Sequence, residues 1–351
     1  MRFARLAGLL LAAVAVVLWA VNMTVLQPLT EPIGPWSEQL PGNNAYWARD
    51  LRFATIVAVV LALVLAGRGD RRWIRLAVPL GGVWVAVDLA VDRADPTGAR
   101  PTVLLAAGGC AVLAALATLL VRRTVDASAA DRRAGQPIGT AHRCALAAAA
   151  SVAGVLTMVA AGIESPTDRE PELNPAAVAA AALLTALALG CALAAAPTPT
   201  WPRRWLAVGA GAATLVGIGL LRTVSPEDGR VLPEVLLGAV LLTALTLLAW
   251  DWPHGRPDWR RHALAALAAL IAPMVMLLAA VLATMLLRIG APFTALAGNS
   301  PIHAADSDVL LSLAGVLAGL GMAPLIAWPP ALTGRRASPD PVPPLRSGSP
   351  H

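Results

Sequence analysis

The chain contains no lysine, and all of its 27 basic residues are arginine. A GC-rich coding bias accounts for this, together with the abundance of alanine, 29 glycines and 29 prolines. The composition therefore indicates a GC-rich bacterium as the source.

Aromatic residues are also scarce, with one tyrosine and three phenylalanines. The net charge of +6 would suit nucleic acid, but such a site needs clustered basic residues with base-stacking aromatics. Here the arginines are spread over many separate segments. This excludes nucleic acid as a partner.

Cysteine is limited to Cys110, Cys144 and Cys191, each within or at the edge of an apolar segment. They form no C-x-x-C pair, so neither a disulfide framework nor a metal site is expected. The chain also has no G-x-x-x-x-G-K-[ST] stretch, which excludes a self-contained ATP-driven pump. No cofactor is expected.

Long apolar runs dominate what is present, and 57% of the residues are hydrophobic. A membrane helix needs about 20 apolar residues. The sequence therefore predicts an all-α polytopic integral membrane protein with about ten transmembrane helices, the short second one needing Arg52 and Arg68 to reach the interface. The predicted spans are 6–26, 51–66, 74–91, 102–121, 144–162, 176–196, 205–221, 234–250, 263–287 and 309–328.

Charge between these spans predicts their orientation, because cytoplasmic loops retain arginine. With the N-terminus and C-terminus both cytoplasmic, 19 arginines and 6 acids lie inside, against 8 arginines and 14 acids outside. The expected location is the cell (plasma) membrane. Tryptophans support the orientation, because seven of them fall at the predicted inner interface, where an anchoring belt is expected. Its members are Trp73, Trp201, Trp205, Trp250, Trp252, Trp259 and Trp328.

The predicted domain organisation is one transmembrane domain over 1–328 and a disordered cytoplasmic Pro/Ser/Arg-rich tail over 329–351. Arg2 and Arg5 before an apolar run also resemble a signal peptide. The run continues to Leu26 with no clean A-x-A site, so we expect an uncleaved first helix. Basic pairs that open outward-going helices suggest duplicated helical hairpins, although any hairpin that spans a bilayer has similar features.

Asp88 is the best functional candidate, because ionisable groups inside a membrane are expensive and mark functional sites. It lies one helical turn before Asp92, so the two carboxylates share a face and could carry a proton. The alternative is that Asp88 reaches interfacial water. Arg222 and Arg288 lie at the outer ends of the seventh and ninth spans, where the charge bias disfavours arginine. They could form structural ion pairs with the outer acids or with Asp88, or they could bind a substrate.

The two longest outer loops, 27–50 and 289–308, could cap a site that faces the exterior. They contribute Asp50, His303 and Asp306 to a candidate outer-loop site. A solvated loop explains His303 better than a metal ligand does, so no metal is expected.

Three functions are consistent with this pattern. The first is a secondary transporter or permease for a small solute, with two inverted halves of five spans. The second is a non-catalytic scaffold or partner subunit of an envelope or export complex, with a membrane-protein partner or a homo-oligomer. The third is a membrane-embedded transferase for a lipid-linked substrate, using Glu31, Glu38 or Asp50. An enzyme is the least favoured.

Overall fold

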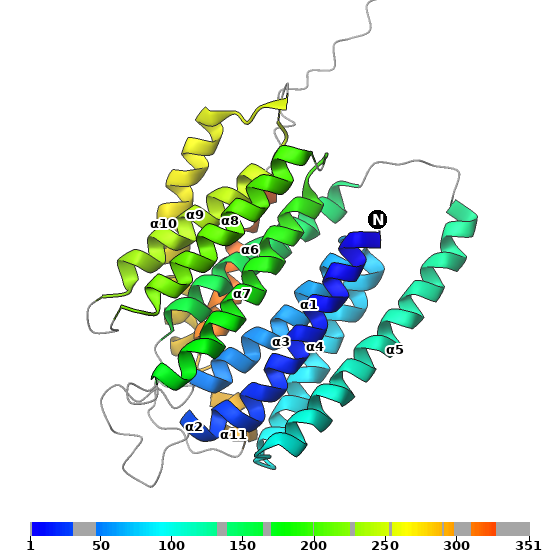
Figure 1. The fold of residues 1–351 in the computed structure, drawn as a ribbon, viewed down its shortest axis with the longest axis vertical. Helices are drawn as coiled ribbons and strands as arrows, with labels where there is room; N and C mark the ends of the chain where they lie inside the picture. Colours follow the sequence, from blue (N-terminus) through cyan, green and yellow to red (C-terminus); the bar gives the residue numbers. More distant parts are fainter. Residues whose placement is uncertain are drawn as a thin grey trace, which may run out of the picture.

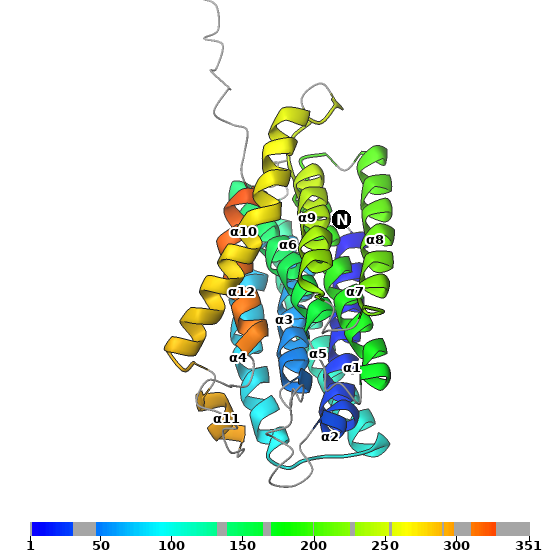
Figure 2. The same ribbon diagram turned by 90° about the vertical axis from the view of Figure 1, so that its left-hand side faces the viewer.

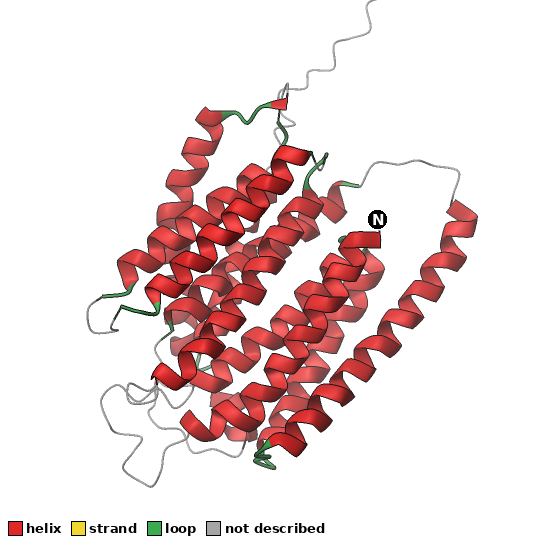
Figure 3. Cartoon of the chain, viewed as in Figure 1, coloured by secondary structure: helices red, strands yellow, loops and turns green. Residues whose placement is uncertain are grey.

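The structure is a computed structural model of the full chain, and every element in its described residues is helical or a turn, with no strand (Figure 3). It describes residues 2–30, 47–131, 139–163, 170–198, 200–224, 229–252, 255–289, 291–297 and 310–327. The predicted tail and loop residues Glu31, Glu38, His303 and Asp306 lie outside these ranges.

Most of the helices follow the predicted apolar runs, since a segment of about 20 residues satisfies all its backbone groups within the membrane. Their bounds are α1 (Arg2–Val21), η1 (Asn22–Leu26, a π-helix), α2 (Gln27–Thr30), α3 (Trp47–Ala66), α4 (Arg71–Asp92), α5 (Ala99–Asp131), α6 (Thr140–Gly162), α7 (Glu170–Ala195), α8 (Trp201–Leu221), α9 (Val231–Ala249), α10 (Trp259–Leu286), α11 (Ala291–Ala297) and α12 (Leu310–Ala327).

The long helices run up and down in turn and form one bundle (Figures 1 and 2). We call its two ends the Arg2 end, where α1 begins, and the Asp92 end, where α4 finishes. The last helix, α12, returns to the Arg2 end (Figure 2). Helices α2 and α11 lie at the Asp92 end, which the charge count predicts to be extracellular.

Nine helices among the described residues are long and apolar enough to cross a membrane. The second predicted span is also a helix, the 20-residue α3, but it differs in character. It carries Arg49, Asp50 and Arg52 in its first two turns, and nearly all of its residues are buried among other helices. Arg52 does not reach the interface: only 2% of it is exposed. The protein is an all-α multi-pass membrane protein in which α3 is an internal helix.

Helices α6 and α7 form the centre of the bundle, with 83% and 61% of their apolar windows buried, whereas α5 and α8 have 17%. Small residues bring the central helices close together, as expected where no hydrophobic force acts between helices. A Cβ on Gly319 of α12 would lie 2.5 Å from the Val152 Cα of α6. On the other side, a Cβ on Gly8 of α1 would lie 2.6 Å from the Ala62 carbonyl oxygen of α3.

The tight turn before α4 holds the α3–α4 hairpin together. Arg68 and Gly69 have φ angles of 54° and 75°, and Asp70 then caps α4 by accepting a hydrogen bond from the Arg72 backbone NH at 2.8 Å. A Cβ on Gly69 would lie 2.4 Å from the His142 carbonyl oxygen, so this position requires glycine. The hairpin places the charged start of α3 beside the charged end of α4.

Tryptophans at the Arg2 end divide into two groups. Trp201, Trp205 and Trp259 are exposed, as an anchoring belt requires, whereas Trp73 is only 1% exposed and packs in the core. Trp250 is half-buried and stacks on His262 with ring centroids 5.0 Å apart. The predicted belt is therefore made partly of core residues.

Candidate functional site

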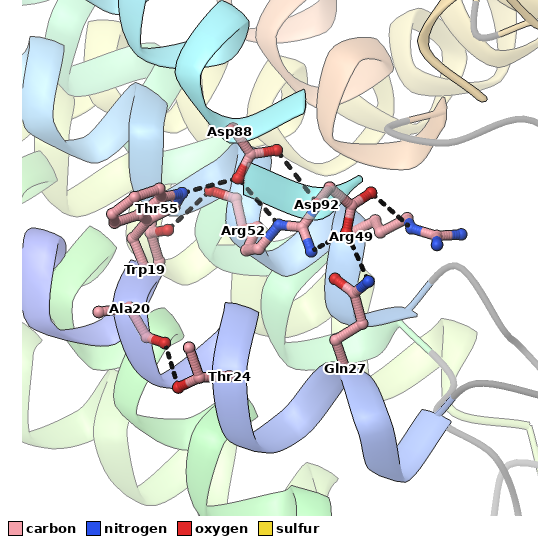
Figure 4. A network of polar contacts seen from close by, with 9 residues as sticks. All are labelled: Trp19, Ala20, Thr24, Gln27, Arg49, Arg52, Thr55, Asp88 and Asp92. Carbon is pink, nitrogen blue, oxygen red and sulfur yellow. Dashed lines mark hydrogen bonds and ion pairs between the residues drawn. The ribbon is translucent and has the colours of Figure 1, made fainter. Parts of the chain in front are cut away.

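Two arginines of α3 and two aspartates of α4 form a buried cluster near the Asp92 end (Figure 4). Arg49 is 7% exposed, Arg52 2%, Asp88 7% and Asp92 5%. We call these four residues, with Trp19 and Gln27, the charge cluster. Its four charges sum to zero, which is the condition under which charges are tolerated inside a membrane protein.

Helical spacing brings the four side chains together. Asp88 and Asp92 are four residues apart on α4, and Arg49 and Arg52 are three apart on α3, so each pair occupies one helix face. The paired faces meet because α3 and α4 are joined by the tight turn at Gly69. The spacing of these residues along α3 and α4 thus places two carboxylates opposite two guanidinium groups.

Arg52 lies between the two carboxylates (Figure 4). Its Nε is 2.9 Å from the Asp88 Oδ1, and its Nη2 donates to the Asp88 Oδ2 at 3.1 Å. The remaining nitrogen, Nη1, donates to the Asp92 Oδ1 at 3.2 Å. Arg49 adds a contact of 3.4 Å from its Nε to the Asp92 Oδ2. Among the described residues, Asp88 therefore contacts one arginine and Asp92 contacts two.

The first transmembrane segment completes the charge cluster. The Trp19 indole NH donates to the Asp88 Oδ1 at 2.7 Å, and the Gln27 side-chain amide donates to the Asp92 Oδ1. In an ideal α-helix these residues, eight apart, would be rotated by about 80° from each other. The π-helix Asn22–Leu26 lies between them and offsets this rotation, since its turns hold more residues. Such π segments occur frequently at functional sites.

A small cavity of about 10 Å³ adjoins the charge cluster, which is about the space for one water molecule. All four charged residues line it. The other lining residues in the described part of the chain are apolar: Phe53 of α3, Val85 and Leu89 of α4, and Phe293 of α11. The cavity thus has one charged wall and one apolar wall.

Asp50 has a different role from its neighbours. Its Oδ1 accepts a hydrogen bond of 2.9 Å from the Ser312 backbone NH, while the Ser312 hydroxyl donates to the Asp50 carbonyl oxygen at 2.7 Å. Asp50 is 3% exposed. These contacts fasten α3 to the beginning of α12, and the structure does not bring Asp50 into the charge cluster.

A second buried ion cluster joins α7, α8 and α9 at the same end of the bundle. Glu170 pairs with Arg230 and lies 3.7 Å from the Arg222 Nη2. Arg222 also donates to the Asn174 side chain at 2.7 Å and to the Ile163 carbonyl oxygen at 2.9 Å. Burial lowers the pKa of Arg222 to about 10, helped by Arg230, which leaves it positive at neutral pH.

The other proposed site residues are therefore placed as follows. Arg222 pairs within the second cluster and Arg288 is exposed, so neither lies among the partners of Asp88 described above. His303 and Asp306 lie outside the described residues. Within the described ranges, no group of three or more His, Cys, Asp or Glu side chains is suited to a metal ion.

Sequence reasoning did not find Arg52, Trp19 and Gln27 as the partners of the two aspartates. One signal was available, because Arg49-x-x-Arg52 repeats with helical spacing and so matches the carboxylates of α4. The contributions of Trp19 and Gln27 depend on the π-helix, which has no signature in these residues.

The buried pairs also explain several exceptions to the charge bias. Of the eight arginines predicted to be extracellular, Arg49, Arg52, Arg222 and Arg230 are buried and paired with acids. Arg93, Arg100 and Arg288 are exposed, and Arg169 lies outside the described residues. The surface at the Asp92 end is thus less basic than the residue count suggests.

Comparison with known proteins yields no family. No protein-family model matches the chain, and no curated protein and no solved structure matches it either.

Proposed function

We propose that this protein is a proton-coupled secondary transporter for a small solute, in the cell membrane with its Arg2 end in the cytoplasm. The single observation that carries the proposal is the charge cluster, in which buried carboxylates share Arg52 beside a small cavity. Intramembrane ionisable groups of this kind serve proton relays and solute pathways in transporters.

Asp88 is the group that takes up the proton. In the described part of the chain, Arg52 is its one ion-pair partner, whereas Asp92 is held by Arg49, Arg52 and the amide of Gln27. Protonation of Asp88 removes one of the charges that hold the Arg52 guanidinium group and so weakens their ion pair. Proton uptake and solute binding are thereby coupled through one side chain.

Two sets of helices provide the parts that move. The first set, α1 to α5, holds the charge cluster, and the second set, α6 to α12, holds the cluster of Glu170, Arg222 and Arg230. This division differs from the two halves of five spans predicted from the sequence, because α6 belongs to the second set. Helices α1 and α3 meet α6 and α7 between the sets. One small residue lies at this boundary, since a Cβ on Gly190 of α7 would lie 3.1 Å from the Leu65 side chain of α3. Rocking of one set against the other would give alternating access.

The proposal is tested in proteoliposomes that contain a pH-sensitive dye, with an imposed proton gradient and a library of small solutes. We expect solute-dependent proton entry with the wild type and loss of at least about 100-fold with Asp88→Asn. Glu170→Gln is the matched control, because it also removes one buried acid that pairs with arginine. Equal flux in Asp88→Asn and wild type, with both proteins folded by size-exclusion chromatography, would contradict the role of Asp88.

One observation favours a second candidate, a partner subunit of a membrane complex. Helix α5 packs mainly on α1 and leaves most of its apolar surface uncovered, as Figure 1 shows at the edge of the bundle. Copurification of a stoichiometric membrane protein in mild detergent, lost on substitution of exposed α5 residues such as Leu104 and Val112, would support this candidate.

A further inference from the structure

We infer that Glu234 of α9 is a second proton-binding site, whose carboxyl group holds a proton while it lies against the end of α6 and pairs with Arg230 after releasing it. This inference goes beyond the proposed function, because it gives the second set of helices a proton site of its own and does not depend on Asp88. It rests on the surroundings of the Glu234 carboxyl group and on a buried nitrogen atom of Arg230.

The Glu234 carboxyl group lies on the backbone of α6. Gly162 is the last residue of α6, and a Cβ added there would overlap this carboxyl group, with the Glu234 Oε1 at 2.8 Å. The missing side chain of Gly162 therefore leaves the space that the carboxyl group fills. Arg222 donates to the neighbouring carbonyl oxygens of Ala161 at 3.4 Å and Ile163 at 2.9 Å. The end of α6 is thus held by Arg222 while Glu234 covers Gly162.

The Glu234 carboxyl group has no partner among the described residues. No hydrogen bond or ion pair joins it to another group there, although its side chain is half-buried in the first turn of α9. An isolated carboxylate costs far more free energy to take out of water than a neutral carboxyl group does. A proton therefore accompanies the group into this position. Because the side chain keeps some exposure at the Asp92 end, water can deliver and remove that proton.

Arg230 provides a partner for the carboxylate that remains when the proton leaves. It lies four residues before Glu234, so the two side chains start from the same side of the chain at the beginning of α9. The Arg230 Nε donates to the Val224 carbonyl oxygen at 2.6 Å, and its Nη2 donates to Glu170. Its Nη1 has no hydrogen-bond partner in the described part of the chain, although only 5% of the residue is exposed. A buried donor without a partner is costly, so a carboxylate at Nη1 stabilises both groups.

Loss of the proton breaks only the O–H bond of the Glu234 carboxyl group. The proton passes to water, both electrons of the bond stay on the carboxylate, and rotation of the side chain moves it from Gly162 to the Arg230 Nη1. Nη2 keeps its contact with Glu170, because one guanidinium group can bind two carboxylates through separate nitrogen atoms, as Arg52 does in the charge cluster. Return of a proton reverses the movement.

The charged groups around the outer end of α9 identify Arg230 as this partner. Helices α6, α7, α8, α10 and α12 pack against α9, and the described residues of α6 and α12 bring no charged group to the Asp92 end. Glu170 of α7 is paired with Arg222, at the end of α8, and with Arg230. Glu172 of α7 and Arg288 after α10 are exposed. Of these groups, Arg230 alone has a buried nitrogen atom that lacks a partner in the described residues.

The experiment labels protonated carboxyl groups in the purified full-length protein in detergent micelles. Dicyclohexylcarbodiimide is an apolar reagent that adds a protonated carboxyl group across its C=N bond, and mass spectrometry of the peptides locates the product. Glu170 is the internal control, because it is buried at the same end but paired with arginine. At about pH 7 we expect Glu234 to be labelled at least about 10-fold more than Glu170. Equal labelling of the two, or no labelling of Glu234, would overturn the inference and leave the proposed transport untouched, since no transport is measured.

Gly162→Ala tests the position against α6. The added methyl group takes the space of the carboxyl group, so labelling of Glu234 should fall at least about 5-fold. Gly209→Ala is the matched control, because its added Cβ meets no atom within 4 Å, and it should change labelling less than about 2-fold. Unchanged labelling in Gly162→Ala, with the variant folded by size-exclusion chromatography, would contradict the proton-bound position.

Arg230→Gln tests the partner of the released form. Without the guanidinium group the carboxylate is less stable, so Glu234 keeps its proton to higher pH, and the pH at which labelling falls by half should rise by about 1 unit. Arg288→Gln removes an exposed arginine at the same end and should shift this midpoint by less than about 0.3 units. Equal shifts in the two folded variants would contradict the pairing with Arg230. Gly162→Ala still decides the proton site if Arg230→Gln does not fold.

Discussion

Arg52 and Asp88 face each other inside the bundle through two contacts, from Nε to Oδ1 at 2.9 Å and from Nη2 to Oδ2 at 3.1 Å. Both residues are more than nine-tenths buried, so solvent does not weaken the pair. A buried ion pair is strongly destabilised when only one partner is removed, because the other charge stays buried alone. The pair is therefore both the proposed coupling site and a measurable part of the stability of the hairpin.

The first prediction concerns this pair. Asp88→Asn or Arg52→Gln alone should lower the free energy of unfolding by about 3 kcal/mol, since each leaves a net buried charge. The double variant should lose less than the sum of the two, because the cluster is neutral again. Reversible unfolding in mixed detergent micelles measures the four free energies. Strictly additive effects would show that the two side chains do not interact.

The second prediction tests independence of the two ion clusters. Asp88→Asn and Glu170→Gln lie in separate groups of helices, and their described ion pairs involve different arginines. Their effects on the free energy of unfolding should add within about 0.5 kcal/mol. The same micelle unfolding experiment gives the result, and a coupling above about 1 kcal/mol would mean that the two sets of helices are energetically linked.

A third prediction concerns helix packing. Gly319→Ala would place a Cβ 2.5 Å from the Val152 Cα, so α12 and α6 must separate, at about 1–3 kcal/mol of stability. Gly209→Ala is the matched control, because no atom lies within 4 Å of its added Cβ. Thermal unfolding midpoints compare the two variants. A decrease in the control as large as that in Gly319→Ala would argue against the close approach as the cause.

A fourth prediction concerns the hydrogen bond that the Trp19 indole NH donates to Asp88. Trp19→Phe keeps an aromatic ring but removes the hydrogen bond of 2.7 Å to Asp88, and should lower the free energy of unfolding by about 2 kcal/mol. Trp201→Phe, at a residue 65% exposed, should change it by less than about 0.5 kcal/mol. If Trp19→Phe and Trp201→Phe changed the free energy of unfolding by nearly the same amount, the effect at Trp19 would come from aromatic packing and not from its hydrogen bond to the carboxylate.

The last prediction concerns orientation. With Cys110, Cys144 and Cys191 replaced by alanine, a membrane-impermeant thiol reagent applied to whole cells should label Asp168→Cys and leave Ser128→Cys unlabelled. After the membrane is opened, both should react. Labelling of position 128 alone in whole cells would reverse the orientation, and with it the side from which a proton reaches Asp88.

The amino-acid sequence by itself determined the all-α multi-pass architecture, because runs of about 20 apolar residues in a membrane have only helical solutions. It also placed Asp88 and Asp92 on one helix face, since helical periodicity is a local property. Most of the helices also follow the apolar runs that the sequence shows.

Only the tertiary structure decided which cation Asp88 meets. By sequence, Arg222 and Arg288 were its potential partners, but the α3–α4 hairpin instead brings Arg52 to it and leaves Arg222 with Glu170. It also showed that α3 lies inside the bundle, where its three charged residues are covered by other helices. The physical reason is that a charge buried in a membrane protein must be neutralised by a neighbour, and which helices become neighbours depends on packing between distant segments.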